Sequence, residues 1–199
     1  MNRSIGVTLN ALGLYGVALV LVAAFAGQIV LGELPCPLCL LQRVLFAMLA
    51  IGPILNIRFG PNPGHYALSL LAAMVGAAVS ARQILLHIMP RDPGYGSALL
   101  GYHYYTWAFI AFVAAIVLIA IVLLFDDRLP DNEVARPLGL FASGAVWLVI
   151  GLTAINAAST LLECGFRACP DNPTFYELLK RPLRCGVSGG CPSGPDRGS

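Results

Sequence analysis

The sequence predicts an all-α integral membrane protein. Of its 199 residues, 58% are hydrophobic and only 11% are charged, whereas soluble domains average roughly 25% charged residues. So little polar material cannot cover a soluble globule of this size, and a bilayer must solvate most of the surface. Five apolar stretches are each long enough to cross a hydrocarbon core, which takes about 20 residues. The net charge of +2 is small and spread along the chain, so no nucleic-acid partner is expected.

The first two apolar stretches flank a short loop. Residues 11–31 form the first, and a signal peptide is the alternative interpretation because Ala24-Phe25-Ala26 resembles a cleavage site. Its apolar region is long for a signal peptide, and four more stretches follow. The second covers residues 38–57 and begins directly after Pro35-Cys36-Pro37. The Gly- and Pro-rich residues 60–64 then predict a turn.

Three further stretches complete the predicted bundle. Residues 66–88 are rich in small side chains, which let membrane helices approach closely, so an interior helix is expected. A loop over residues 90–103 precedes the fourth stretch, residues 104–125. The fifth stretch, residues 138–162, is followed by a polar tail rich in Pro, Gly and Cys.

The distribution of arginines favours a cytoplasmic amino terminus. Loops on the amino-terminal side carry Arg3, Arg58, Arg128 and Arg136, and cytoplasmic loops are enriched in basic residues. Several basic residues in the tail weaken this bias. In that orientation all six cysteines lie at the outer face, in a compartment where disulfides persist.

Cys36 and Cys39 form a Cys-x-x-Cys pair at the predicted start of the second helix. Thiol–disulfide oxidoreductases use this spacing, and a helix amino terminus favours the reactive thiolate. Half a zinc site or an inert pair are the alternatives. Arg43 falls on the same helix face, inside the membrane edge, where an arginine costs up to roughly 2.5–3.5 kcal/mol. A functional role is therefore expected, with a snorkelling anchor as the alternative.

Polar residues near the end of the third helix are candidates for a pocket at the same depth. Arg82, Gln83 and His87 lie there if the topology holds. Ordinary interfacial anchoring is the alternative for these residues.

The tail holds two close cysteine pairs by sequence, Cys164 with Cys169 and Cys185 with Cys191. Four cysteines permit three connectivities, between which sequence cannot choose. Static disulfides that staple the tail are one interpretation. A four-cysteine zinc site is another, but the spacings are not those of a tight ribbon, and no metal is expected.

Pro35-Cys36-Pro37-Leu38-Cys39 followed by Gln42-Arg43, at the head of a second spanning helix, resembles the DsbB family of quinone-linked disulfide-forming membrane proteins. The resemblance covers about residues 11–125. It implies a four-helix bundle of DsbB type over residues 1–137, to which this chain adds a fifth transmembrane helix (138–162) and an irregular Cys-rich tail (163–199).

The resemblance also implies an activity, a cofactor and a partner. The protein would reoxidise a DsbA-like periplasmic thioredoxin-fold protein at the bacterial inner membrane and pass the electrons to ubiquinone or menaquinone. By resemblance Cys36 exchanges with a second cysteine pair, Cys39 contacts the quinone and Arg43 helps hold it. The cluster of Arg82, Gln83 and His87 is the further expected quinone-binding set.

Two departures from the family pattern stand out. The loop 90–103 has no cysteine where the best-known members carry their mobile pair, and the chain adds a fifth span. We expect these departures to explain each other, with Cys164 and Cys169 as the shuttle pair at the outer face. The alternatives are a non-enzymatic membrane protein with a stapled or metal-binding tail, or an enzyme like vitamin K epoxide reductase.

Overall fold

The computed structural model describes residues 3–89, 92, 94–124, 139–165, 169, 176 and 178. The elements in chain order are α1 (Arg3–Val30), α2 (Pro37–Leu49), α3 (Ile51–Phe59), α4 (Pro63–Leu86), β1 (Ala98–Leu99), β2 (Tyr102–His103), α5 (Tyr104–Leu124) and α6 (Leu140–Cys164). The charged loop before α6 and most of the tail, including Cys185 and Cys191, lie outside the described residues.

Five segments are long and apolar enough to cross a membrane, as the sequence predicts: Ile5–Val30, Pro37–Phe59, Pro63–Leu86, Tyr104–Leu124 and Leu140–Cys164. Large apolar side chains cover their outer surfaces; Leu19 is 70% exposed and Trp147 is 69% exposed. Such a surface needs lipid as its solvent. The prediction of an all-α, multi-pass membrane protein is confirmed.

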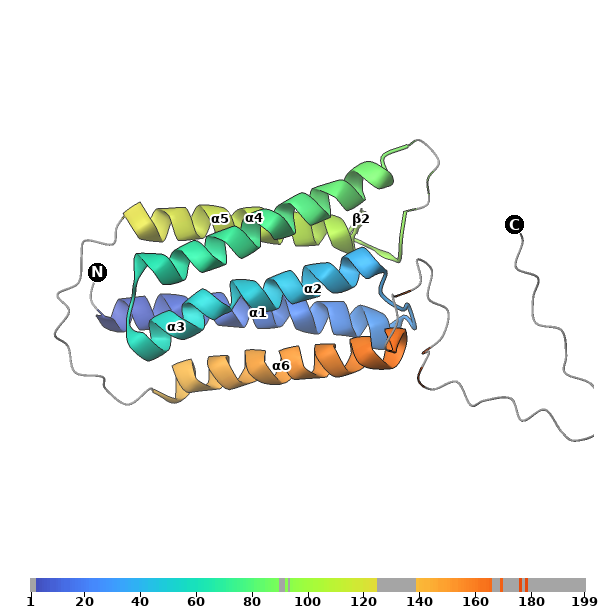
Figure 1. Cartoon of the computed structure of the whole chain (residues 1–199). Coiled ribbons are helices and arrows are strands. Elements are labelled where there is room, and N and C mark those ends of the chain that lie inside the picture. Colours follow the sequence, from blue (N-terminus) through green and yellow to red (C-terminus); the bar gives the residue numbers. More distant parts are fainter. Residues whose placement is uncertain are drawn as a thin grey trace, which may run out of the picture.

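The helices pack as an elongated bundle (Figure 1). Helices α4 and α5 lie together on one side, α1 and the α2–α3 pair lie in the middle, and α6 runs along α1 on the opposite side. Close approach of α4 to α5 depends on Gly76, because a Cβ there would collide with the ring of Phe112. That ring also stacks on Phe46 of α2, with 3.9 Å between ring centroids. Helix α4 thus packs closely on α5 and α2, but it lies at one side of the bundle with Leu71 and Met74 at least half exposed, so the arrangement does not support the expected interior position of the third span.

The second span is interrupted between α2 and α3. Pro53 lacks the N–H that would bond to the Leu49 carbonyl in a continuous helix. The Ser69 hydroxyl of α4 donates to that carbonyl oxygen at 2.7 Å instead. A neighbouring helix thus satisfies the backbone group that the proline leaves free, as a membrane interior requires.

A small β-hairpin precedes α5, and the sequence analysis did not predict it. Ala98 pairs with His103 and Leu99 pairs with Tyr102 in an antiparallel ladder. The two residues of the turn, Leu100 and Gly101, have φ values of 54° and 84°. Two successive positive φ values are typical of the type I′ turn that matches strand twist.

One end of the bundle gathers the start of α2 and the ends of α1, α4 and α6 (Figure 1). Cys36 and Cys39 lie at the start of α2, and Cys164 ends α6. The fold therefore brings both close cysteine pairs of the described chain to the same end.

Candidate functional site

Cys36 and Cys39 form a disulfide, with 5.0 Å between their Cα atoms. Cys36 is the N-cap of α2, and its Sγ accepts a hydrogen bond of 3.1 Å from the Cys39 backbone N–H. Pro37 takes the first helical position, where a missing N–H costs nothing. The helix begins two residues later than Pro35, yet the pair lies at the positive end of the helix dipole, as predicted.

Gln83 reaches this disulfide from α4. Its side chain is 1% exposed, and its Nε2 donates to Cys36 Sγ at 3.2 Å and to Cys39 Sγ at 3.5 Å. Its Oε1 accepts 2.9 Å from Gln42 Nε2, which fixes the orientation of the amide. The structure thus brings the predicted Gln83 to the cysteines, together with Gln42.

The two other predicted residues of α4 lie elsewhere. Arg82 is exposed and does not line the cavity beside the cysteines. His87 ends α4, where its Nδ1 lies 3.2 Å from Asp92 and its ring stacks on Tyr105 with 5.7 Å between centroids. A quinone-binding role for Arg82 and His87 stays a prediction that this geometry does not support.

Asp92 organises the loop after α4. Its Oδ1 accepts 2.8 Å from the Gly94 N–H. That hydrogen bond, followed by the contact with His87, holds the pKa of Asp92 below its usual value. The carboxylate therefore favours its ionised form in the folded loop.

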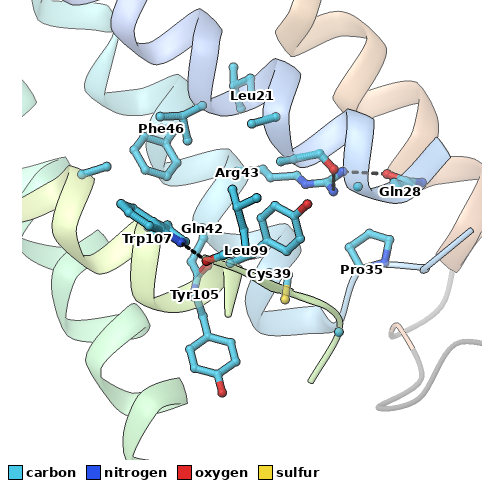
Figure 2. Close-up of a pocket in the computed structure, with 18 of the residues that line it drawn as sticks. Leu21, Gln28, Pro35, Cys39, Gln42, Arg43, Phe46, Leu99, Tyr105 and Trp107 are labelled. Carbon is cyan, nitrogen blue, oxygen red and sulfur yellow. Dashed lines mark hydrogen bonds between the residues drawn. The ribbon is translucent and has the colours of Figure 1, made fainter. Parts of the chain in front are cut away.

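Arg43 extends from α2 toward α1 and is held at a fixed orientation (Figure 2). Its guanidinium donates 2.7 Å to Gln28 Oε1 and 2.9 Å to the Ala24 carbonyl oxygen. The ring of Phe25 lies beneath the guanidinium, with 5.3 Å from Cζ to the ring centroid. Two acceptors and a stacked ring around the guanidinium are more than a snorkelling side chain needs.

Helix α6 and the tail contribute to the surroundings of Arg43. Gln28 Nε2 donates 2.9 Å to Ser159 Oγ and 3.1 Å to the Tyr176 hydroxyl. Asn156 Oδ1 lies 3.5 Å from the guanidinium. The sequence analysis did not identify Gln28 or Asn156, although a lone amide in an apolar span signals a polar interior contact.

A cavity of about 340 Å³ opens beside the cysteines. Cys39, Gln42 and Arg43 of α2 line it together with Gln28 of α1, and the rest of its wall comes from apolar residues of α1 and α5 and from the loops before α2 and after α4. Figure 2 shows Cys39 and Arg43 at the same cavity, with the Trp107 Nε1 donating 3.0 Å to the Leu99 carbonyl across from them. The volume lies in the range of small-ligand sites.

A second, mainly apolar cavity lies next to the first along the bundle. This cavity of about 480 Å³, lined mainly by residues of α1 and α5, shares Val20, Phe46 and Ala111 with the first. The two cavities are therefore neighbours, separated by these three residues. Together they run from the disulfide end toward the middle of the membrane span.

Hydrogen bonds connect the loop between α4 and α5 to the loop before α2. Ser97 donates to the Glu33 carboxylate through its N–H at 2.9 Å and its hydroxyl at 2.6 Å. The Tyr95 hydroxyl donates 2.8 Å to the Leu34 carbonyl. Burial, and then the charges of Glu163 and Glu33, raise the pKa of Tyr95. This loop thus covers one wall of the cavity beside the cysteines.

Cys164 and Cys169 form the second disulfide, with 4.6 Å between their Cα atoms. This pairing is one of those the sequence left open, whereas a role as a shuttle pair stays a prediction. Among the residues described, no group of three or more His, Cys, Asp or Glu side chains is placed to hold a metal ion.

Known proteins resemble this chain over its amino-terminal part. The family model for Disulfide bond formation protein DsbB matches residues 7–97. Disulfide bond formation protein B of Xanthomonas axonopodis pv. citri is 38% identical over 86 residues, which are 41% of this chain and 50% of that protein. Its counterpart in Chromobacterium violaceum is 41% identical over 75 residues, which are 35% of this chain and 44% of that protein. The chain thus spans about half the length of these two relatives.

A longer similarity links the chain to Disulfide bond formation protein B of Saccharophagus degradans. The two are 36% identical over 146 residues, which are 68% of this chain and 81% of that protein. No solved structure matches the chain significantly. Because this similarity extends over most of a curated relative, and the family model includes the Cys36–Cys39 segment, the chain belongs to the DsbB family.

Proposed function

We propose that this protein is a membrane thiol–disulfide oxidoreductase that reoxidises the dithiol of a periplasmic, DsbA-like thioredoxin-fold protein and passes the electrons to a quinone. The observation that carries the proposal is that a Cys-x-x-Cys disulfide lies at a membrane cavity whose lining also includes the partly buried guanidinium of Arg43. The membership of the DsbB family supports the same assignment.

The cavity fits a lipid-soluble quinone by its chemistry. Cys39 and Arg43 place a sulfur and a cation at one end, where a polar ring would lie. The groove past Val20 and Ala111 is apolar and suits an isoprenoid tail. Ubiquinone and menaquinone share these features, so either satisfies the site.

The protein's own residues would bind, orient and stabilise charge. A quinone supplies a two-electron acceptor when it is bound. Cys39 presents its sulfur to the cavity, and Arg43 would stabilise negative charge that develops beside it. Gln83 would donate hydrogen bonds to the thiolates formed when the disulfide is reduced.

The Cys164–Cys169 pair would relay electrons from the partner. In the first exchange the partner's two thiols become a disulfide, while the tail disulfide becomes two thiols. The tail dithiol then reduces the Cys36–Cys39 disulfide. Reoxidation of Cys36 and Cys39 delivers two electrons and two protons to the quinone. The orientation that this requires has the amino terminus in the cytoplasm and the tail in the periplasm.

The test is quinone reduction by the purified protein in detergent. A reduced thioredoxin-fold partner and a ubiquinone or menaquinone analogue are added, and quinone absorbance is followed. We expect reduction that needs the partner and is lost in Cys39→Ser. No reduction with either quinone and several partners would favour a non-enzymatic protein with a stapled tail.

The relay is tested with the double variant Cys164→Ser/Cys169→Ser. We expect it to lose oxidation of the partner, while a small dithiol that reaches Cys36 directly still supports quinone reduction. Unchanged partner oxidation would overturn the relay and leave the tail disulfide as a structural staple.

A further inference from the structure

One face of α6 is polar although the helix is otherwise apolar. Asn156, Ser159 and Glu163 follow one another at spacings that place them on the same side of a helix. The first two reach the Arg43 network through Arg43 itself and through Gln28. α6 lies beyond residue 97, where the match to the family model ends.

Glu163 is the most deeply buried member of this face. Its side chain is 1% exposed, and neither carboxylate oxygen has a hydrogen-bond partner among the residues that the structure describes. Arg43, which reaches the same face of α6 at Asn156, is close enough to act on this carboxyl through space, although the two side chains do not form a direct ion pair. A buried carboxyl without hydrogen bonds depends on nearby opposite charge to stay ionised. An ionisable residue inside a membrane bundle is therefore a functional candidate.

We propose that Glu163 is a positioning residue of the Arg43 site, which neutralises the guanidinium when it is ionised and leaves its positive charge available to the cavity when it is protonated. This inference rests on the proposed function, because the charge of Arg43 matters where thiolate and quinone react. It adds a role for the fifth span, which would supply the proton-responsive group of the site.

The proton balance of the overall reaction is unaffected by this role. Oxidation of the Cys36–Cys39 dithiol releases two electrons and two protons, and the reduction of a quinone to a quinol takes up the same number. Glu163 therefore returns to its starting state after each turnover. Its protonation sets only how much of the Arg43 charge faces the cavity.

Several other charged or titratable groups surround this carboxyl. Arg43 faces it from α2, and Tyr176 of the tail interacts with Arg43 in turn. Tyr95, from the loop after α4, interacts with both Glu163 and Glu33. The adjacent Cys164 is held in a disulfide and does not titrate. Among the described residues that interact with Glu163, Arg43 is the cation, and its charge is the one that Glu163 offsets.

The test compares quinone reduction across pH in wild type, Glu163→Gln and Glu163→Asp. Glutamine copies the protonated carboxyl, so its rate should equal the wild-type rate at acidic pH. At alkaline pH, where Glu163 is ionised in wild type, kcat/KM for quinone should be severalfold higher in the glutamine variant. Glu163→Asp should restore the wild-type dependence. A ratio of glutamine variant to wild type that stays constant with pH would overturn the proposal.

A matched control is available on the same helix. The Thr160 hydroxyl donates 2.9 Å to the Asn156 backbone carbonyl within α6, so Thr160→Val removes a polar group without touching the site. It should retain the wild-type pH profile. Thermal unfolding of all variants excludes misfolding as the cause, and the direct exchange of a small dithiol with Cys36–Cys39 should be equal in all of them.

An infrared titration tests the inference without any quinone. The infrared carbonyl band of protonated Glu163 is identified as the band that wild type shows and Glu163→Gln lacks. In wild type this band should disappear as the pH rises. In Arg43→Gln the midpoint of that change should move to higher pH, because the stabilising cation is gone. A midpoint that does not move overturns the coupling. If the infrared midpoint moves as expected but the protein reduces no quinone, the proposed function is refuted and the coupling of Glu163 to Arg43 stands.

Discussion

The Ser69 hydroxyl of α4 donates a 2.7 Å hydrogen bond to the Leu49 carbonyl at the end of α2. Ser69 is fully buried, and Pro53 has removed the amide that would otherwise satisfy this carbonyl. In a membrane no water can replace the serine. This single hydrogen bond therefore allows the second span to be interrupted while the Leu49 carbonyl keeps a hydrogen-bond partner inside the bundle.

We predict that Ser69→Ala lowers the free energy of unfolding by about 1–3 kcal/mol, the cost of an unsatisfied buried group. Unfolding in a detergent titration measures it. Ser80→Ala is the matched control on the same helix, since Ser80 is equally buried and its Oγ has no partner among the described residues. It should be neutral or stabilising. Equal losses in the two variants would contradict this account.

Gln83 contacts both sulfurs of the first disulfide, whereas its neighbour Arg82 is exposed. We predict that Gln83→Leu slows alkylation of the reduced cysteines at least severalfold, because a hydrogen bond to the charged thiolate is worth about 1.5–3 kcal/mol. Quinone reduction should fall with it. The rate of mass-detected alkylation is the measurement.

The variant Arg82→Ala distinguishes the structure, in which Arg82 is exposed, from the sequence-based prediction that Arg82 binds the quinone. The structure favours a smaller effect than that of Gln83→Leu in the same two measurements. A larger effect of Arg82→Ala would restore the sequence-based assignment of that residue to the quinone site.

The periodicity and hydropathy of the sequence were sufficient for the five spans and for the Cys36–Cys39 pair, since these depend on local composition and spacing. Cys39 and Arg43 line the same cavity, because positions i and i+4 share a helix face and this relation can be read from the sequence. The partners of Arg43 were not predictable in the same way. Gln28 and Asn156 lie on α1 and α6, and which faces of separate helices meet depends on packing of the whole bundle.

The same reason explains why Arg82 was grouped with Gln83. Adjacent residues of a helix point about 100° apart, so only one of them can face α2. The sequence predicts that Arg82 and Gln83 lie at the same depth in the membrane as Arg43, near the cysteines. It does not predict the rotation of α4 about its own axis, which decides which of the two faces the cysteines. In the structure Gly76 packs against the ring of Phe112 on α5, a contact between helices that the sequence alone does not reveal.

Tyr95 should make the outer loop sensitive to alkaline pH. Its pKa is raised in the folded protein by burial and by nearby carboxylates. A raised pKa means that its stabilising contribution is complete below the unfolded value of about 10 and is lost as pH rises through the folded pKa. We predict that wild type loses thermal stability over that alkaline window more steeply than Tyr95→Phe.

The Tyr95→Phe variant lacks the bond to the Leu34 carbonyl at every pH, so it should also be less stable at neutral pH. Tyr102→Phe is the control, because the Tyr102 side chain is 57% exposed. Unfolding midpoints against pH decide the matter. Parallel curves for wild type and Tyr95→Phe would show that the phenol does not titrate in this window.

Ala111 lies where the two cavities meet. A phenylalanine there should block the groove for a long isoprenoid tail and leave the ring site open. We predict that Ala111→Phe raises KM for a long-chain quinone about tenfold, or about 1.4 kcal/mol, with little change for a short-chain analogue. Ala120→Phe, at an exposed position of α5, should change neither. A similar rise for both chain lengths would place the tail elsewhere.

Arg43→Lys tests whether the arginine acts through its geometry or only through its charge. Lysine keeps the positive charge but cannot donate in a fixed fork to Gln28 and to the Ala24 carbonyl. Each hydrogen bond to a charged group is worth about 1.5–3 kcal/mol, so KM for quinone should rise at least tenfold while kcat falls less. Arg43→Gln removes the charge as well and should lower kcat further. Arg58→Lys, an exposed position on α3, should match wild type in steady-state kinetics. Full activity of Arg43→Lys would mean that charge alone suffices, and the contacts from α1 and α6 would then serve stability rather than the reaction.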